Sequence, residues 1–281
     1  MHRLKALFIS SFMTVLMAAM ALAIWRLIAT PASVGHWALL VASGLPMAFF
    51  MRLFVGSVAR TGRNLWWMPG IGAVCAVVAA ASGAGATAVL IAGVGVVLPL
   101  IYIHWYSRFG KRQSTVLSTG KPLPDVPLET LQGEATSAHR YTQQPALWLF
   151  FRGNWCPLCM AQIKEVAAQY RALADRGVQV LLISPQAESN SVALAKKFDA
   201  PMTFLKDANN RAARRLGILA EGGLPMGMQV LGYDSDVPMP TVLITDAHGV
   251  IVYCDLTDDY RIRPEPSEFL AAVERMGLNA A

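Results

Sequence analysis

Two cysteines separated by two residues, Cys156 and Cys159, are the side chains in this sequence best suited to covalent chemistry. A continuous apolar run at 146–151 precedes them, and after Cys159 apolar residues recur at spacings of four and three, as on one face of a helix. The pair is therefore expected where a strand ends and a helix begins. Pro157 suits the first turn of that helix because its φ is fixed and it has no N–H to leave unpaired.

A thiolate at this position is favoured by the unpaired backbone N–H groups of the first turn and by the positive end of the helix dipole. We therefore expect the helix to lower the pKa of Cys156 and to make Cys156 the nucleophile. Cys159 lies one turn further along the helix, less exposed but within bonding range. It is expected to attack a mixed disulfide or a sulfenic acid formed on Cys156.

The segments around the pair alternate between the patterns of strands and helices. Apolar runs predict strands at 146–151, 178–184, 202–205, 241–245 and 250–255, the last two joined by a hairpin turn at 246–249. Helical patterns fall between them at 159–173, 191–198 and 209–216, and a closing helix is expected at 266–276. This order predicts an α/β domain with a mixed sheet flanked by helices.

The run from Phe150 to Cys159 resembles the strand, Trp-Cys-x-x-Cys, helix active site of the thioredoxin superfamily. Within it, Phe-Arg-Gly-x-Trp-Cys-Pro-x-Cys is similar to the peroxiredoxin-like branch of the alkyl hydroperoxide reductase/thiol-specific antioxidant (AhpC/TSA) family. The resemblance covers residues 120 to about 276, and its further matches lie at 121–126, 182–185, 195–198, 206–207 and 240–246. It implies a thioredoxin-like fold.

The resemblance also implies roles for residues beside the cysteines. In thioredoxin-like proteins the proline that enters the late strand follows a cis peptide bond and lies where substrate backbone docks, which points to Pro240. Trp155 would shield the disulfide on one side or serve as a core aromatic residue.

This sequence departs from both templates at three positions. Typical peroxiredoxins have Thr or Ser three residues before the nucleophilic Cys and an Arg on the late strand, where this chain has Gly153 and Pro240. Thioredoxin has a buried Asp where this chain has Phe150. The groups that polarise a peroxide are therefore expected to be rebuilt, with Arg152 as the candidate.

The first part of the chain has the composition of a membrane protein. The sequence is 54% hydrophobic and 15% charged, and residues 1–107 carry almost no acidic side chains. Four apolar stretches approach the length that crosses about 30 Å of hydrocarbon, at roughly 6–25, 37–51, 65–81 and 87–106. We therefore expect a helical transmembrane segment at 1–107, a linker at 108–120 and the thioredoxin-like domain at 121–281.

The basic residues predict the orientation of this segment, because Lys and Arg accumulate on the cytoplasmic side. They precede the first stretch, lie between the second and third, and follow the fourth; Arg26 alone falls on the other side. The prediction is a multi-pass protein of the cell (inner) membrane with a cytoplasmic redox domain, and a periplasmic domain is the alternative. The first stretch also has some features of a signal peptide, whose removal would leave the side of the domain unchanged.

Two reactions remain open for the cysteine pair. Thiol–disulfide exchange, with Cys156 attacking, Cys159 resolving and Pro240 shaping the docking surface, is the leading hypothesis. Thiol-dependent peroxide reduction, with Cys156 peroxidatic and Cys159 resolving, is the alternative. The partners would be a disulfide-containing protein or a peroxide as substrate, and thioredoxin or glutathione as reductant, beside the lipid bilayer.

Two further classes are weaker. A zinc module needs two more ligands, and Cys254, His139 and His248 offer no second close pair. A non-catalytic membrane scaffold would not need both cysteines. No cofactor or metal is predicted, and the net charge of +6 is too scattered to indicate nucleic-acid binding. Cys75 and Cys254 are expected to be structural, with the alternative that Cys254 is a third redox partner if it faces the active-site end of the sheet.

Overall fold

The computed structural model of the protein describes residues 2–29, 33–112, 114, 116–198 and 200–277. The chain separates into two compact units. One comprises Arg3–Gly56 and Gly62–Arg108, and the other comprises Ser57–Thr61 and Phe109–Ala281. The short segment Ser57–Thr61 therefore belongs to the C-terminal unit, although it lies between two helices of the N-terminal unit in the sequence.

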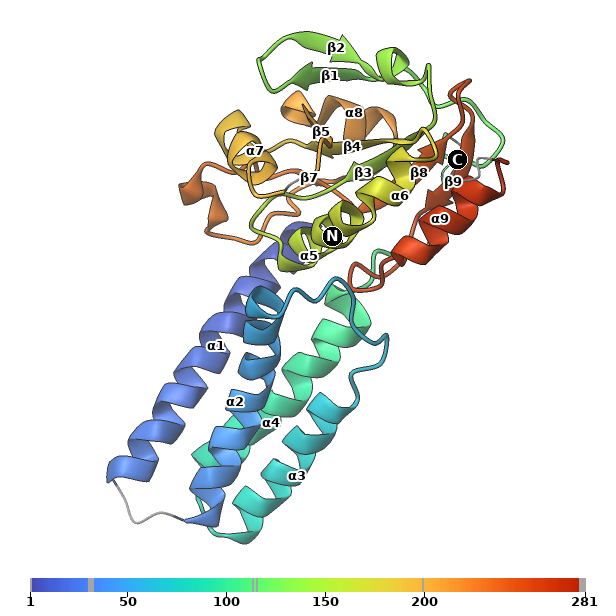
Figure 1. Cartoon of the computed structure of the whole chain (residues 1–281). Coiled ribbons are helices and arrows are strands. Elements are labelled where there is room, and N and C mark those ends of the chain that lie inside the picture. Colours follow the sequence, from blue (N-terminus) through green and yellow to red (C-terminus); the bar gives the residue numbers. More distant parts are fainter. Residues whose placement is uncertain (1, 30–32, 113, 115, 199, 278–281) are drawn as a thin grey trace. The chain divides into compact units, whose positions relative to one another are not determined.

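The N-terminal unit is helical, as its composition predicts (Figure 1). Its elements are α1 (His2–Ala29), α2 (Val34–Val55), α3 (Trp67–Ala81) and α4 (Ala86–Ile101), which continues into a π-helical turn, η1 (Tyr102–Tyr106). α2, α3 and α4 pack through small residues: a Cβ on Gly72 would lie 2.5 Å from the carbonyl oxygen of Gly95. Small residues let backbones approach closely in this way where apolar helices associate in a membrane.

Three of these helices are long and apolar enough to cross a membrane: His2–Ala29, Val34–Val55 and Ala86–Tyr106. Trp67–Ala81 is apolar but has 15 residues, which at 1.5 Å per residue gives about 22 Å. The four stretches read from the sequence are thus four helices, and the third is shorter than the hydrocarbon core.

The C-terminal unit is built on a seven-stranded mixed sheet in the order β2-β1-β5-β4-β3-β8-β9. β3, β4 and β5 are parallel, and β1, β2, β8 and β9 run antiparallel to their neighbours. The strands are β1 (Pro127–Thr130), β2 (Ala135–Ser137), β3 (Ala146–Phe150), β4 (Gln179–Ser184), β5 (Thr203–Lys206), β8 (Thr241–Thr245) and β9 (Ile251–Asp255). A separate antiparallel pair is formed by β6 (Leu219–Ala220) and β7 (Val237–Pro238).

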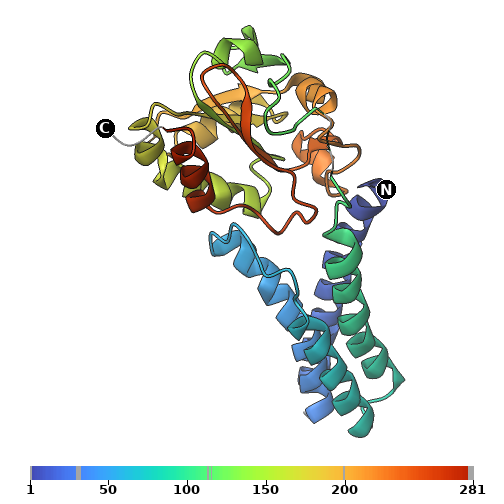
Figure 2. The same cartoon turned by 90° about the vertical axis from the view of Figure 1, so that its right-hand side faces the viewer.

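Helices cover both faces of this sheet, as Figures 1 and 2 show for α5, α6 and α9 on one face and α8 on the other. The helices are α5 (Pro157–Ala168), α6 (Tyr170–Ala174), α7 (Glu188–Ala195), α8 (Arg211–Arg215) and α9 (Pro266–Glu274), with single 3₁₀ turns η2 (Ala138–Tyr141), η3 (Ala208–Asn210) and η4 (Met228–Leu231). Both faces being covered explains why every residue of β3 is buried.

The predicted order of strands and helices from 146 onward is confirmed, and so is the thioredoxin-like fold class. The sequence did not predict β1, β2, β6 and β7. These strands are two to four residues long, and β1 and β2 are only partly buried at an edge of the sheet. Such short segments carry no readable apolar alternation.

Candidate active site

The two cysteines lie at the carboxyl end of the central strand, where the sequence predicts them. β3 ends at Phe150, and Cys156 is the N-cap residue of α5 with Pro157 as the first helical residue. Both thiols are free and nearly inaccessible: Cys156 is 3% exposed and Cys159 is 0% exposed. Cys156 is therefore slightly the less buried residue of the two.

A buried guanidinium faces the inner cysteine. Nη2 of Arg263 lies 3.6 Å from Sγ of Cys159, and its Nη1 donates to Oε1 of Gln162 at 2.8 Å. Arg263 is 4% exposed, and its Nε has no hydrogen-bond partner among the described residues. The contact places a full positive charge on a sulfur that is shielded from water, which favours a thiolate there.

The pair therefore holds its charge on the inner sulfur. Burial works against ionisation of Cys159, but a hydrogen bond from the Cys156 thiol and the charge of Arg263 together lower the pKa of Cys159 to about 5. The same hydrogen bond, followed by burial, raises the pKa of Cys156 well above its usual range. The predicted low pKa of Cys156 is thus wrong for the reduced pair, because the Cys156 thiol is held protonated by its hydrogen bond with Cys159 and by its own burial.

The residues just before Cys156 form a compact aromatic and cationic cluster. The guanidinium of Arg152 lies 4.7 Å from the ring centre of Trp155 and donates to the carbonyl oxygen of Gly223. Trp155 packs edge-on against Tyr233 with ring centres 6.5 Å apart. Arg152 thus adds positive charge at the site, whereas Arg263 is the arginine in contact with a sulfur.

Gln186 fixes the loop that carries this cluster. Its Oε1 accepts from the backbone N–H of Asn154 at 2.8 Å, and its Nε2 donates to Oγ of Ser191 at 3.0 Å. The hydroxyl of Tyr233 donates to Oδ1 of Asn154. None of these three hydrogen bonds was predicted from the sequence. The bonds to Asn154 join residues more than thirty positions apart, and the Gln186–Ser191 bond joins two polar residues that belong to no recognisable motif.

The expected cis bond before Pro240 is wrong: the Met239–Pro240 peptide is trans, and no described peptide bond is cis. The N–H of Met239 donates to the carbonyl oxygen of Ile218 at 2.7 Å, which extends the β6–β7 pairing and brings the chain into β8 in an extended conformation. The carbonyl oxygen of Pro240 accepts from Nη1 of Arg112 at 2.9 Å. Pro240 is buried at the same end of the sheet as the cysteines, since Thr241 pairs with Phe150.

The other two cysteines lie apart from the pair. Cys254, on β9, packs against the core cluster that includes side chains of α8, and burial raises its pKa to about 11. Cys75 lies among alanines of the N-terminal helices. Among the described residues, no group of three or more His, Cys, Asp or Glu side chains is placed to hold a metal ion.

The domain that contains the cysteine pair is similar to known proteins. Residues 119–254 match the model of the AhpC/TSA family. Peroxiredoxin Q from chloroplasts of Gentiana triflora is 29% identical over 111 residues, covering 39% of this chain and 51% of that protein. The corresponding protein of Populus jackii is 27% identical over 111 residues, covering 39% of this chain and 52% of its own. The chain thus spans about half the length of these curated relatives.

A solved structure of reduced Prx3 from Vibrio vulnificus, in complex with hydrogen peroxide, aligns with a TM-score of 0.49 and 15% identity, covering 56% of this chain and 99% of that one. The mixed sheet and a Cys-x-x-Cys pair at the start of α5 define a thiol protein of the thioredoxin superfamily. Within that class, residues 119–254 form a peroxiredoxin-like domain that is similar to the AhpC/TSA family, whose model they match.

Proposed function

We propose that this protein is a thiol-dependent peroxidase that works at a membrane, with Cys156 as the peroxidatic residue and Cys159 as the resolving residue. The family match over residues 119–254, which includes both cysteines, carries the proposal. The buried, cation-stabilised thiol pair supports it, because reduction of a peroxide requires a thiolate.

In the first step the thiolate of Cys159 takes the proton of the Cys156 thiol across their hydrogen bond. The resulting Cys156 thiolate attacks the nearer peroxide oxygen and the O–O bond breaks. The departing alkoxide or hydroxide takes up one proton from solvent and leaves as alcohol or water. Cys156 becomes a sulfenic acid and has lost two electrons. The greater exposure of Cys156 supports its role as the attacking sulfur.

In the second step Cys159 attacks the sulfur of the sulfenic acid. A disulfide forms and the hydroxyl group leaves as water, so the net reaction converts a dithiol and a peroxide into a disulfide, an alcohol and water. The coupling of the two thiols supports this step, since Cys156 at the N-cap and Cys159 in the first turn of α5 lie one helical turn apart. A dithiol reductant of the thioredoxin type, or glutathione, would return the pair to its reduced state.

Thiol–disulfide exchange is the second candidate. It is favoured by the Cys-x-x-Cys spacing and by Gly153, which offers no hydroxyl to a peroxide where typical peroxiredoxins have Thr or Ser. The same pair would then attack a protein disulfide instead of a peroxide.

Single-turnover oxidation of the reduced full-length protein in detergent tests the choice, with hydrogen peroxide or a mixed disulfide as oxidant. A peroxidase consumes peroxide rapidly, loses this reaction in Cys156→Ser, and in Cys159→Ser stops at a Cys156 sulfenic acid that dimedone traps. Cys254→Ser is the matched control and should react like the parent protein.

Rapid exchange with the disulfide and slow reaction with peroxide would replace the proposal with the second candidate. Peroxide consumption that survives in Cys156→Ser and disappears in Cys159→Ser would reverse the two roles.

A further inference from the structure

The connection between α2 and α3 contributes a segment to the C-terminal unit. Ser57–Thr61 clusters with that unit, and Ala59 within it is 3% exposed. The hydroxyl of Ser57 accepts from Nζ of Lys164 on α5 at 3.3 Å. The segment is thus packed against the helix that carries Cys159.

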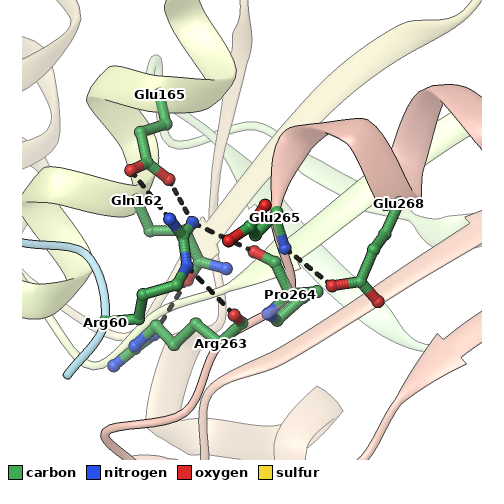
Figure 3. A network of polar contacts seen from close by, with 7 residues as sticks. All are labelled: Arg60, Gln162, Glu165, Arg263, Pro264, Glu265 and Glu268. Carbon is green, nitrogen blue, oxygen red and sulfur yellow. Dashed lines mark hydrogen bonds and ion pairs between the residues drawn. The ribbon is translucent and has the colours of Figure 1, made fainter. Parts of the chain in front are cut away.

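Arg60 binds both α5 and the backbone of residues 263 and 264, as Figure 3 shows. Its Nη1 and Nη2 donate to the two carboxylate oxygens of Glu165 on α5, the Nη1 bond being 3.2 Å long. Its Nε donates to the carbonyl oxygen of Arg263 at 3.2 Å, and its Nη2 donates to that of Pro264 at 3.3 Å. One planar guanidinium therefore joins α5 to the backbone on which Arg263 stands.

Thr61 adds a second attachment to the same backbone. Its N–H donates to the carbonyl oxygen of Arg261 at 3.0 Å, and its Oγ1 accepts from Nη1 of Arg261 at 3.1 Å. Arg261 itself is fully buried against Asp259, with Nη2 and Oδ2 3.1 Å apart. Residues 261–264 are therefore held from one side by the buried ion pair and from the other by Arg60 and Thr61.

The hydrogen bonds of Arg60 and Thr61 connect the two elements between which Arg263 contacts Cys159. α5 supplies Cys159, Gln162 and Glu165, and the facing backbone supplies Arg263, whose own side chain reaches Gln162 and Sγ of Cys159. Arg60 ties the two sides together without touching a sulfur. A guanidinium contact to sulfur depends on its distance, so the separation of the two sides sets how strongly Arg263 acts on Cys159.

We propose that Arg60, from the connection between the second and third apolar helices, is a positioning residue that holds the Arg263 guanidinium against Cys159. The proposal rests on the redox role proposed for the cysteine pair. The test measures the ionisation of the cysteine pair and uses no electrophile. The role of Arg60 can therefore be confirmed or rejected even if the protein does not reduce peroxides.

Other charged groups around the pair are fixed by other elements. Cys156 and Arg152 face Cys159 from the β3–α5 connection. Burial raises the pKa of Asp255 on β9 to about 6, whereas Arg112 and Arg263 oppose that rise. Arg60 is paired with Glu165, so losing Arg60 also leaves a carboxylate on α5 without its partner, which disfavours the Cys159 thiolate. Glu165→Gln loosens the same attachment but changes the local charge in the opposite sense, so it separates geometry from charge.

The test titrates the thiolate by its ultraviolet absorbance in the full-length protein in detergent, with Cys75 and Cys254 replaced by Ser. The parent should titrate with a midpoint near 5, the pKa of Cys159. Arg60→Gln should raise this midpoint by about one pH unit, which is about tenfold less thiolate at a pH below it. Arg60→Lys keeps the charge but not the two-pronged geometry and should restore the midpoint only in part.

The Arg263→Gln variant shows whether Arg60 acts through Arg263. It should raise the midpoint by itself. In the Arg263→Gln/Glu165→Gln background, where no carboxylate is left unpaired, Arg60→Gln should change nothing further, because Arg60 acts through Arg263. Arg176→Gln is the matched control: this arginine also binds a carboxylate, that of Glu274 at 3.3 Å, and should leave the midpoint unchanged.

An unchanged midpoint in Arg60→Gln, or a further shift when Arg60→Gln is added to Arg263→Gln/Glu165→Gln, would overturn the proposal. Full restoration by Arg60→Lys would also overturn it, since a simple charge effect would then suffice. If Arg60→Gln does not fold, Glu165→Gln makes the same test, because it removes the α5 attachment and keeps the bonds of Arg60 to residues 263 and 264.

Discussion

Gly153 shows how a single residue separates this site from the typical peroxiredoxin arrangement. Its φ is +146°, and a Cβ there would lie 2.7 Å from Nε1 and 2.8 Å from Cδ1 of Trp155. The position that holds Thr or Ser in typical peroxiredoxins has no space for a side chain here, because Trp155 fills it. The aromatic ring under Arg152 and a hydroxyl at position 153 therefore exclude each other.

Gly153→Ala should destabilise the protein and slow oxidation of the pair. The unfavourable φ costs about 1–3 kcal/mol, and the new methyl group must also push Trp155 away from Arg152. Thermal unfolding and single-turnover oxidation measure the two effects. Gly133→Ala is the control, since Gly133 has φ +79° with open space around its Cβ position, so it should lose stability without a change in oxidation rate.

At the scale of elements, β3 is the strand on which the site depends. It is central in the sheet, and its Trp148 is fully buried with Nε1 donating to Oγ1 of Thr245 on β8 at 3.0 Å. This bond joins β3 to the antiparallel neighbour that begins beside Pro240. It satisfies the one polar atom of a large apolar side chain in the core.

Thr245→Val keeps the shape of the threonine but removes the acceptor for Trp148. A buried donor left without a partner costs about 1–3 kcal/mol, so the unfolding temperature should fall. Thr136→Val on β2 is the matched control, because the Thr136 hydroxyl is buried and has no hydrogen-bond partner among the described residues. Its replacement should be neutral or stabilising, and equal losses in the two variants would contradict this account.

The elements that position the cysteines were predictable because each has a strong local pattern. β3 and β4 are continuous apolar runs, α5 begins at a proline, and the β8–β9 turn is closed by the backbone of Asp246 and Gly249. Arg263 and Arg60 were not predicted as site residues. Their bonds to Cys159 and to the 263–264 backbone span 104, 203 and 204 positions, and no local pattern reports contacts at such separations.

At the scale of the whole molecule, the Ser57–Thr61 segment bears on how the chain crosses a membrane. The segment follows α2 and belongs to the same compact unit as the domain that follows α4. If α2 and α4 cross but α3 does not, these two parts of the chain lie on opposite sides and cannot pack together. If α2 and α4 cross a membrane, the contacts of Arg60 with Glu165 therefore require α3 to cross as well, although its 15 residues are few for a span.

This topology is tested by labelling single cysteines in sealed vesicles with a membrane-impermeant maleimide, in a chain whose own four cysteines are replaced by Ser. Ser57→Cys in the α2–α3 connection and Glu134→Cys in the β1–β2 turn should be labelled from the same side. Ser82→Cys in the α3–α4 connection should be labelled from the other, because basic residues lie beside Ser57 and directly after α4 but not beside Ser82. That shared side should be the cytoplasmic one. Labelling of Ser57→Cys and Glu134→Cys from opposite sides would show that α3 does not cross, and it would remove Arg60 from the redox site in the membrane.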